Sequence, residues 1–282
     1  LLPAGDLIVY TEGQNRDRFT AHATAANGFV EGELVILLDD FSASASEIVA
    51  GAVQDNDRGL VVGRRSFGKG LVQEQFRLAD GSALRLTVAR YYTPSGRSIQ
   101  KPYQGKDEAY YADIMNRYIH GEMDNRDSIH QNDSLKYFTL KKNRPVYGGG
   151  GIMPDIFVPL RSSGHSDYFF DLTSKGLIYQ FAFDYTDKNR KSLSKYKIFQ
   201  SFDKNFKVGN ALFEELIRYA KEKGVSGKAG QIRLSKELIK NRFKAYVARN
   251  IIGDHAFYRI INRKDHTLNK AVKDIESGKA RL

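Results

Sequence analysis

The first part of the chain places two short apolar runs on either side of a helical pattern. Residues 33–38 and 60–63 have the apolar character of buried strands. Between them, residues 46–53 combine good helix formers with apolar side chains at helical spacing. A strand-helix-strand order favours two parallel strands joined by a right-handed crossover. The pattern therefore predicts an α/β core.

A β-hairpin is predicted after this unit. Residues 71–78 and 83–92 carry alternating or β-branched side chains, which are typical of strands. They flank Asp80-Gly81, and an Asp-Gly pair is a strong turn signal. We therefore expect two antiparallel strands here.

The α/β part is predicted to carry an insertion before it ends. Residues 101–147 are more polar and richer in Tyr, and Asp107 to His120 fit a helix. The glycine run 148–151 then leads into a short strand within residues 152–158. We expect the α/β part to end near Leu160.

From about residue 165 the pattern becomes helical. Ser235 is a candidate N-cap, and Gly224 and Gly253 lie where helices should stop. Two apolar stripes have helical spacing: Leu212, Phe213, Leu216, Ile217 and Ala220, and Leu238, Ile239, Phe243, Tyr246 and Val247. The prediction is an α/β domain over residues 1–160 and a mainly α-helical domain over 161–282.

Composition supports a globular protein of two domains. The chain has 282 residues, of which 41% are hydrophobic, enough for a packed core but long for a single one. The absence of Cys excludes disulfides, thiol catalysis and Cys-based zinc sites. No window approaches the apolar length of a membrane span, and the first residues lack the pattern of a signal peptide. We expect neither in this sequence.

The positive charge lies in the helical part. Residues 1–160 hold 18 Lys and Arg against 20 Asp and Glu, whereas residues 162–282 hold 25 against 13. Such an excess could attract nucleic acid, an anionic membrane surface or an acidic polypeptide, or form a solvated basic surface. The charges show no base-reading motif, so we expect no specific nucleic-acid binding.

Two segments have residue types suited to catalysis. Ser42, Ser44 and Ser46 lie where a strand should end and a helix begin, and a helix N-terminus offers free N–H groups that can stabilise an oxyanion. From the pattern alone, one of these serines could instead only cap the helix. Lys69 lies between two glycines after a predicted buried strand. Partial desolvation there would favour the neutral amine that can accept a proton from a serine, although a solvated loop lysine is the simpler alternative.

The second segment also resembles a phosphate-binding loop. Gly63 to Lys69 fit that motif except at its last position, where Gly70 replaces the magnesium-binding Ser or Thr. A strand rather than a helix is predicted to follow, so no helix N-terminus would face a phosphate. We therefore reject a nucleotide site.

Taken together, the segments resemble the carboxyl-terminal processing proteases, or tail-specific proteases, of peptidase family S41, in a Bacteroidetes-type form. The matching motifs occur in the family's order: Ser42-Ala43-Ser44-Ala45-Ser46-Glu47-Ile48, Val61-Val62-Gly63, Phe67-Gly68-Lys69-Gly70, Val72-Gln73, Tyr91-Tyr92-Thr93-Pro94-Ser95-Gly96-Arg97-Ser98-Ile99 and Pro154-Asp155-Ile156. They cover residues 1 to about 160. The resemblance implies a partial crotonase/ClpP-like α/β protease core and serine endopeptidase activity on polypeptide tails.

The resemblance assigns roles to individual residues. The family's nucleophile and general base lie 25 positions apart, which selects Ser44 for Lys69 and leaves Ser42 and Ser46 as packing or capping residues. Gln73, four positions after the lysine on an expected strand, would share a face with it and orient it. Ala45 would supply an oxyanion N–H, and the matched helix aspartate, Asp55, is expected to be structural.

The chain also departs from the family. The resemblance places Leu1 in the middle of the protease domain, so a substrate-gripping PDZ domain, the first core strands and the second oxyanion donor would lie upstream. We expect a C-terminal fragment that is inactive alone and that self-associates through its unpaired edge. The family resemblance implies a periplasmic or cell-envelope location.

Other chemistries find little support. The six histidines lie in no recognisable motif, and none has the spacing of a zinc helix, so no metal or other cofactor is expected. A Ser-His-Asp triad stays open from the residues alone, since triads assemble in space, but the resemblance argues against it. The alternative function is a catalytically inactive protease-like binding module, or a fragment whose basic helical domain docks an acidic partner.

Overall fold

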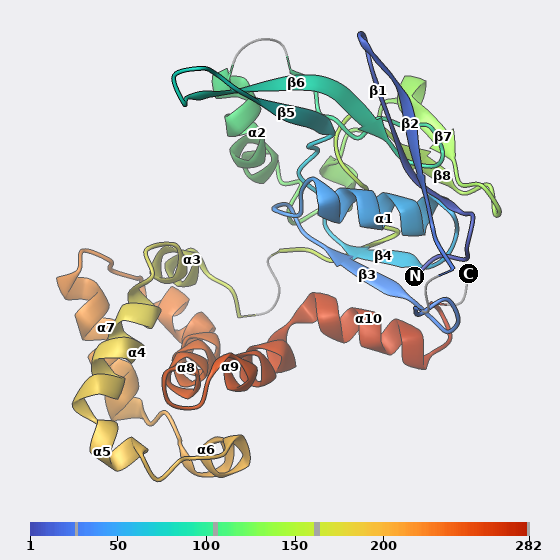
Figure 1. The fold of residues 1–282 in the computed structure, drawn as a ribbon. Helices are drawn as coiled ribbons and strands as arrows, with labels where there is room; N and C mark the ends of the chain where they lie inside the picture. The colour runs from blue at the N-terminus through green and yellow to red at the C-terminus, as the bar shows by residue number, and fades with distance from the viewer. Residues whose placement is uncertain (26–27, 104–106, 161–163, 281–282) are drawn as a thin grey trace. The chain divides into compact units, whose positions relative to one another are not determined.

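The computed structural model describes residues 1–25, 28–103, 107–160 and 164–280 (Figure 1). The chain divides into two compact units. Unit 1 comprises Leu1–Leu160 together with Lys270–Leu282, and unit 2 comprises Arg161–Asn269. Most of the last helix, α10 (His266–Glu276), therefore groups with unit 1 and not with the helical unit before it.

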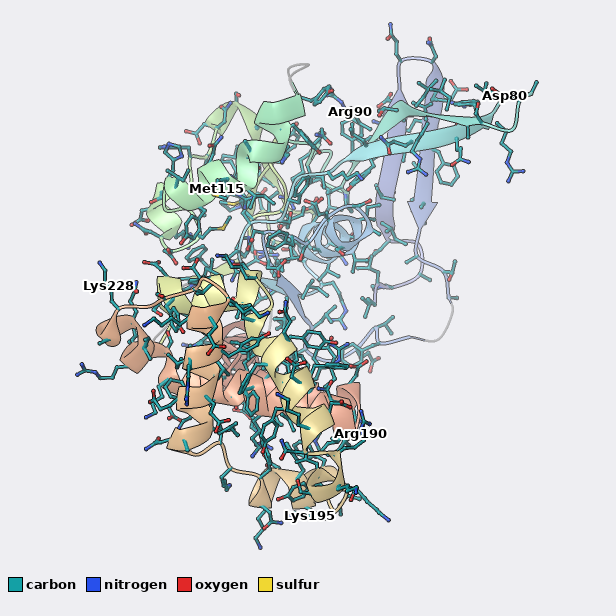
Figure 2. The ribbon with its side chains drawn as sticks, turned by 90° about the vertical axis from the view of Figure 1, so that its left-hand side faces the viewer. Asp80, Arg90, Met115, Arg190, Lys195 and Lys228 are labelled. Atoms are coloured by element: carbon teal, nitrogen blue, oxygen red, sulfur yellow. The ribbon has the colours of Figure 1, made fainter. Side chains whose placement is uncertain are left out.

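Unit 1 contains an antiparallel sheet in the order β2-β1-β6-β5. Its strands are β1 (Leu7–Gly13), β2 (Arg16–His22), β5 (Leu71–Arg77) and β6 (Ala83–Tyr92). The predicted hairpin is confirmed, because β5 and β6 pair antiparallel. Asp80 marks the projecting tip of this hairpin (Figure 2). The strand β2 is missing from the sequence prediction because nearly all of its side chains are exposed and none forms an apolar run.

A second, parallel sheet has the order β3-β4-β9. It consists of β3 (Val35–Leu38), β4 (Leu60–Gly63) and β9 (Ile156–Phe157), and α1 (Ala45–Asp55) connects the first two strands. The predicted parallel strand-helix-strand unit is thus confirmed. The helix α1 contacts β1 of one sheet and β3 and β4 of the other (Figure 1). The fully or nearly buried apolar core of this unit is Leu38, Ala50, Val61, Tyr91, Ile99 and Ile152.

The insertion contains the predicted helix and a small hairpin. Its elements are α2 (Asp107–Ile119), the short 3-10 turns η1 (Arg126–Ser128) and η2 (Asp133–Leu135), and the paired strands β7 (Lys136–Phe138) and β8 (Pro145–Tyr147). Its two ends meet, since the N–H of Gly149 donates to the carbonyl of Ser98 at 2.7 Å and that of Gly151 to Ile99 at 2.8 Å. The insertion therefore leaves and re-enters the core at one place.

Unit 2 is built from helices around one long central helix. Its elements are α3 (Asp167–Ser174), α4 (Leu177–Lys188), α5 (Arg190–Leu193), α6 (Phe199–Asn205), α7 (Asn210–Glu222), α8 (Ala229–Ile251), α9 (Asp254–Ile261) and the turn η3 (Asn262–Lys264). The helix α8 contacts α3, α4 and α9. Both predicted apolar stripes supply buried core residues, including Phe213, Leu216, Ile239 and Phe243.

Two of three predicted helix signals hold. Gly224 follows α7 with φ +82°, and Gly253 separates α8 from α9 with φ +125°, both conformations that glycine adopts without strain. The prediction that Ser235 is an N-cap is wrong, because α8 already begins at Ala229. Ser235 instead lies buried inside that helix and donates to the carbonyl of Gly164 at 2.7 Å.

The surface of unit 2 carries many basic side chains, among them the exposed Arg190, Lys195 and Lys228 (Figure 2). Within the part of the chain that the structure describes, no helix is both long enough and apolar enough to span a bilayer.

Candidate functional site

Ser44 occupies a strained position at the start of α1. It has φ 58° and ψ −118° and is the N-cap residue of the helix. Side chains other than glycine rarely adopt such a conformation, which costs of order 1–3 kcal/mol and is found most often at functional sites. The residue is half-buried at the junction between β3 and α1. The fold thus holds this serine where the free N–H groups of a helix begin.

Ala45 offers one of these free N–H groups. The amides of the next two residues are already used, since Ser46 donates to Ala43 at 3.2 Å and Glu47 donates to Ser44 at 2.9 Å. No described residue accepts a hydrogen bond from the amide of Ala45, which opens the helix and is exposed. A donor next to Ser44 is therefore available to a negatively charged oxygen.

The other two serines have different surroundings. The Ser42 hydroxyl donates to Oδ1 of Asp39 at 3.0 Å within a tight turn. Ser46 is exposed, and its hydroxyl has no hydrogen-bond partner among the described residues. Ser42 therefore serves the turn, and nothing in the structure gives Ser46 a capping role.

Lys69 lies on a segment that packs tightly against the glycine run at the end of the insertion. Gly68 has φ +87°, and a Cβ atom there would lie 3.0 Å from the amide nitrogen of Gly151, so a side chain would meet both strain and a clash. Lys69 itself is half-buried. The strand β5 begins at Leu71, so no helix follows this segment, as expected when the phosphate-binding loop was rejected.

Glu47 joins the serine segment to the lysine segment. Its side chain is fully buried, and one carboxylate oxygen accepts from the amides of Ser44 at 2.9 Å and Lys69 at 2.8 Å. The other oxygen accepts from the amide of Gly68 at 2.7 Å and the hydroxyl of Ser66 at 2.5 Å. The sequence analysis missed this role, although the Ser-x-x-Glu spacing of a capping box was a signal for it.

Tyr91 joins the same two segments a second time. Its hydroxyl donates to the carbonyl of Ser44 at 3.1 Å and also lies against the carbonyl of Lys69. Burial raises the pKa of Tyr91, and the nearby charge of Glu47 raises it further. The hydroxyl therefore keeps its proton and remains a donor to both backbones.

The side chains of the expected catalytic residues are not joined directly. No hydrogen bond between Ser44 Oγ and Lys69 Nζ is present in the described residues. Gln73 is exposed on β5, and none of the described residues forms a hydrogen bond with its side-chain amide. Lys69 lies before β5, which begins at Leu71, and the ladder carries an irregularity between Val72 and Gln73, so the spacing of four along one strand does not apply to these two residues.

Asp55 and Arg97 form a buried ion pair at the opposite end of α1 from Ser44. Nη2 of Arg97 lies 2.7 Å from Oδ1 of Asp55, and both side chains are fully buried. The second oxygen of Asp55 accepts from the amide of Ser95 at 3.1 Å and from its hydroxyl at 2.7 Å. These contacts fix the turn after β6 to the end of α1.

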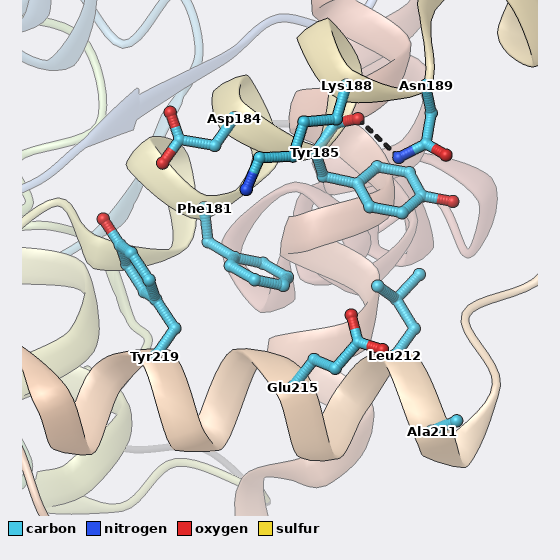
Figure 3. A pocket seen from close by; sticks show the side chains of 9 residues that line it. All are labelled: Phe181, Asp184, Tyr185, Lys188, Asn189, Ala211, Leu212, Glu215 and Tyr219. Carbon is cyan, nitrogen blue, oxygen red and sulfur yellow. Dashed lines mark hydrogen bonds between the residues drawn. The ribbon is translucent and has the colours of Figure 1, made fainter.

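The hollows among the described residues include the following two, and neither is lined by Ser44 or Lys69. One, of about 190 Å³, is lined by the glycine run 148–151 together with Arg65 and His130 in unit 1. The other, of about 490 Å³, lies between α4 and α7, where Asp184 and Tyr219 are among its lining side chains (Figure 3). In the described ranges, no cluster of three or more His, Asp or Glu side chains could hold a metal ion.

Comparison with known proteins relates the N-terminal part to one peptidase family. Residues 1–108 match the profile of peptidase family S41. This part of the chain is therefore similar to that family. Residues 168–253, in the helical unit, match a family of unknown function, DUF8443.

The relatives of this segment are carboxyl-terminal processing proteases. A carboxy-terminal-processing protease of Bartonella bacilliformis is 57% identical over 94 residues, which cover 33% of this chain and 22% of that protein. A carboxyl-terminal-processing protease of Synechocystis is 47% identical over 96 residues, with 33% and 22% covered. The chain thus spans about a fifth of the length of the curated relatives it matches.

A solved structure that is similar to part of this chain is that of the photosystem II D1 C-terminal processing protease. The two sequences are 28% identical, and the match covers 56% of this chain and 28% of that protease, with a TM-score of 0.33.

Proposed function

We propose that this chain carries the nucleophile and the general base of a serine endopeptidase that cleaves polypeptides. Ser44 is the nucleophile and Lys69 is the base in this proposal. The observation that supports it best is the pair of links through Glu47 and Tyr91, which hold the backbones of both residues together at a helix N-terminus.

The proposed reaction is acyl transfer in two steps. Ser44 Oγ attacks the carbonyl carbon of the scissile peptide while the neutral Lys69 amine accepts the hydroxyl proton. The N–H of Ala45 donates to the oxygen that becomes negatively charged. The tetrahedral intermediate expels the amine product, which takes the proton from Lys69, and leaves an ester on Ser44. Water, deprotonated by Lys69, then hydrolyses this ester.

Gln73 is proposed to orient Lys69. Its side-chain amide has no hydrogen-bond partner among the described residues, so its oxygen is available to accept a hydrogen bond from the lysine amine. Both side chains are long and at least partly exposed, which allows them to approach one another when a substrate is bound.

The natural substrate class and location are also proposals. The relatives named above are carboxyl-terminal processing proteases, which supports polypeptide tails as the substrates. The location proposed for this protein, the periplasm or the cell envelope, rests on the family resemblance of its sequence motifs.

The decisive experiment compares the three serines. In the full-length natural protein, Ser44→Ala should abolish cleavage of an unstructured reporter polypeptide, whereas Ser42→Ala and Ser46→Ala should keep most of it. The three variants differ from wild type by one hydroxyl each, so they are matched controls for one another. Cleavage by the Ser44→Ala protein at the wild-type rate would overturn the assignment.

The second candidate is a protease-like binding module without catalysis. It is favoured by the absence of a hydrogen bond between the Ser44 hydroxyl and the Lys69 amine and by the exposure of Gln73 in the described structure. A wild-type protein that binds unfolded polypeptides but leaves every one intact would support this module over the peptidase.

A further inference from the structure

The insertion contributes a buried arginine to the segment that bears Lys69. Arg117, on α2, is only 4% exposed. Its Nη1 donates to the carbonyl of Ser66 at 3.0 Å, and its Nη2 donates to the carbonyl of Arg65 at 2.6 Å. The planar guanidinium thus bonds to two successive backbone carbonyls of one segment.

Carboxylates from the same insertion surround this guanidinium. Glu122 lies 3.4 Å from Nε of Arg117, and Asp113 lies 4.0 Å from its Nη1. Glu122 also pairs with Arg65 at 2.5 Å. Arg117 therefore shares these two carboxylates with Arg65 and Lys101, and they offset part of the cost of burying its charge.

The Lys69 segment is consequently held on two sides. Glu47 of α1 accepts from the amides of Gly68 and Lys69, while Arg117 of α2 donates to the carbonyls just before them. With both amides and carbonyls bonded to buried charges, the backbone between residues 65 and 69 has little freedom to shift.

A second basic residue attaches α2 to the same segment. Lys101 is buried, and its Nζ lies 3.9 Å from the ring centre of Phe67 and 4.2 Å from that of Tyr110. The same amine donates to the carbonyl of Tyr110 at 2.8 Å and to Asp113 at 3.2 Å. The side chain of Phe67 is thereby fixed between the core and the insertion.

We propose that Arg117 is a positioning residue for the peptidase reaction, through which the insertion sets the place of the Lys69 backbone. This inference rests on the proposed function, because it assigns the base to Lys69. Arg117 acts through the backbone and does not touch the reacting atoms. The role requires arginine, since a lysine at this place could not donate to both carbonyls from one planar group.

The test compares Arg117→Lys and Arg117→Gln with Arg126→Gln, an exposed arginine of the same insertion. We expect both Arg117 variants to lose about tenfold to a hundredfold in kcat, with KM within about twofold, because small displacements of a catalytic group cost rates of this size. Arg126→Gln should match wild type in both measures.

The outcomes distinguish a failure of the positioning role of Arg117 from a failure of the proposed peptidase function. If Ser44→Ala and Lys69→Ala proteins still cleave, the proposed function fails. If those two are inactive while Arg117→Lys keeps the wild-type kcat, only the positioning role fails. Thermal unfolding of each variant is followed by circular dichroism, and an Arg117→Lys protein that is unfolded at the assay temperature would assign the residue to general stability and contradict the proposal.

Discussion

The two units bury different kinds of side chain. Unit 1 encloses charged and amide groups among the described residues, including Glu47, Gln54, Asp55, Arg97, Lys101 and Arg117. In the described part of unit 2 the buried polar residues are the hydroxyl-bearing Ser166, Thr186 and Ser235, while the core is apolar and rich in aromatic rings. Such rings lie close together, as with Phe202 and Phe206, whose centroids are 4.8 Å apart.

The difference shows where geometry is tightly specified. An apolar core is stabilised by the apolar surface area that it buries and by close packing. It tolerates substitutions that conserve apolar character and side-chain volume. A buried charge is costly unless particular partners lie at particular distances, so it constrains the backbone around it. Unit 1 contains the candidate site, and there the buried charges of Glu47 and Arg117 bond to the backbone of the segment that bears Lys69.

The largest effect should come from the base. Lys69→Arg should reduce cleavage as much as Lys69→Ala does, by about 10²- to 10⁴-fold, the range typical of general-base catalysis. Arginine keeps a positive charge but does not release its proton at workable pH. Rates are measured on an unstructured reporter polypeptide, with all variants compared at the same pH. A Lys69→Arg protein with the wild-type rate would show that only the charge is needed.

Breaking the buried ion pair should destabilise unit 1 alone. Asp55→Asn leaves the fully buried Arg97 without its counter-charge, and such a loss typically costs about 3–5 kcal/mol. Urea unfolding is followed by hydrogen exchange in peptides from residues 45–63 and, for unit 2, from residues 229–251. The exposed Asp127→Asn is the control. Equal loss in both sets of peptides would mean that the two units do not unfold independently.

A smaller, pH-dependent effect is expected in unit 2. Hydrogen bonds from Arg263 and Lys244 lower the pKa of Asp203 from 3.8 to about 2, against the opposing effect of burial. Since the folded pKa is the lower one, the stabilisation is complete above about pH 4 and is lost as pH falls through 2. A partly exposed pair of this kind contributes about 0.2–1 kcal/mol.

Asp203→Asn should therefore be slightly less stable than wild type at pH 7 and equal to it near pH 2. Urea unfolding at several pH values measures this, with the exposed Asp171→Asn as the control. A difference from wild type that stays constant between pH 7 and pH 2 would contradict the assigned role of the carboxylate.

The smallest effect concerns the basic surface of unit 2. We expect no sequence-dependent binding of duplex DNA at physiological salt, because the exposed basic side chains are distributed over many helices. Gel shifts with unrelated duplexes at rising salt provide the measurement. Discrimination between duplexes that persists at physiological salt would give this unit a role in nucleic-acid recognition.

Elements with a strong hydrophobic period were predictable from the sequence. The runs that became β3 and β4 are apolar throughout, and the α7 stripe repeats at helical spacing. The strand β2 escaped because its neighbours in the sheet, and not its own pattern, make it a strand. The predicted N-cap at Ser235 was wrong because a serine hydroxyl can form a hydrogen bond from a helix interior as well as from its start.

The candidate site was only partly accessible to sequence reasoning. Motif spacing selected Ser44 and Lys69, and these remain predictions until activity is measured. Glu47 and Arg117 lie 70 positions apart in the sequence, and their convergence on one backbone segment depends on tertiary packing. The expected partnership of Gln73 with Lys69 relied on a strand that begins two residues too late for it.

The meeting ends of the insertion have a consequence for how this protein could have diverged. Gly149 and Gly151 bond to Ser98 and Ile99, so the ends of the insertion stay together, and each doubling of the chain length between them adds only about 0.6 kcal/mol of closure entropy. Segments can be gained, lengthened or exchanged there over generations without rerouting either sheet. A segment acquired in this way and then given Arg117 would turn from a tolerated appendage into a part that catalysis depends on, and its length would thereafter be under selection.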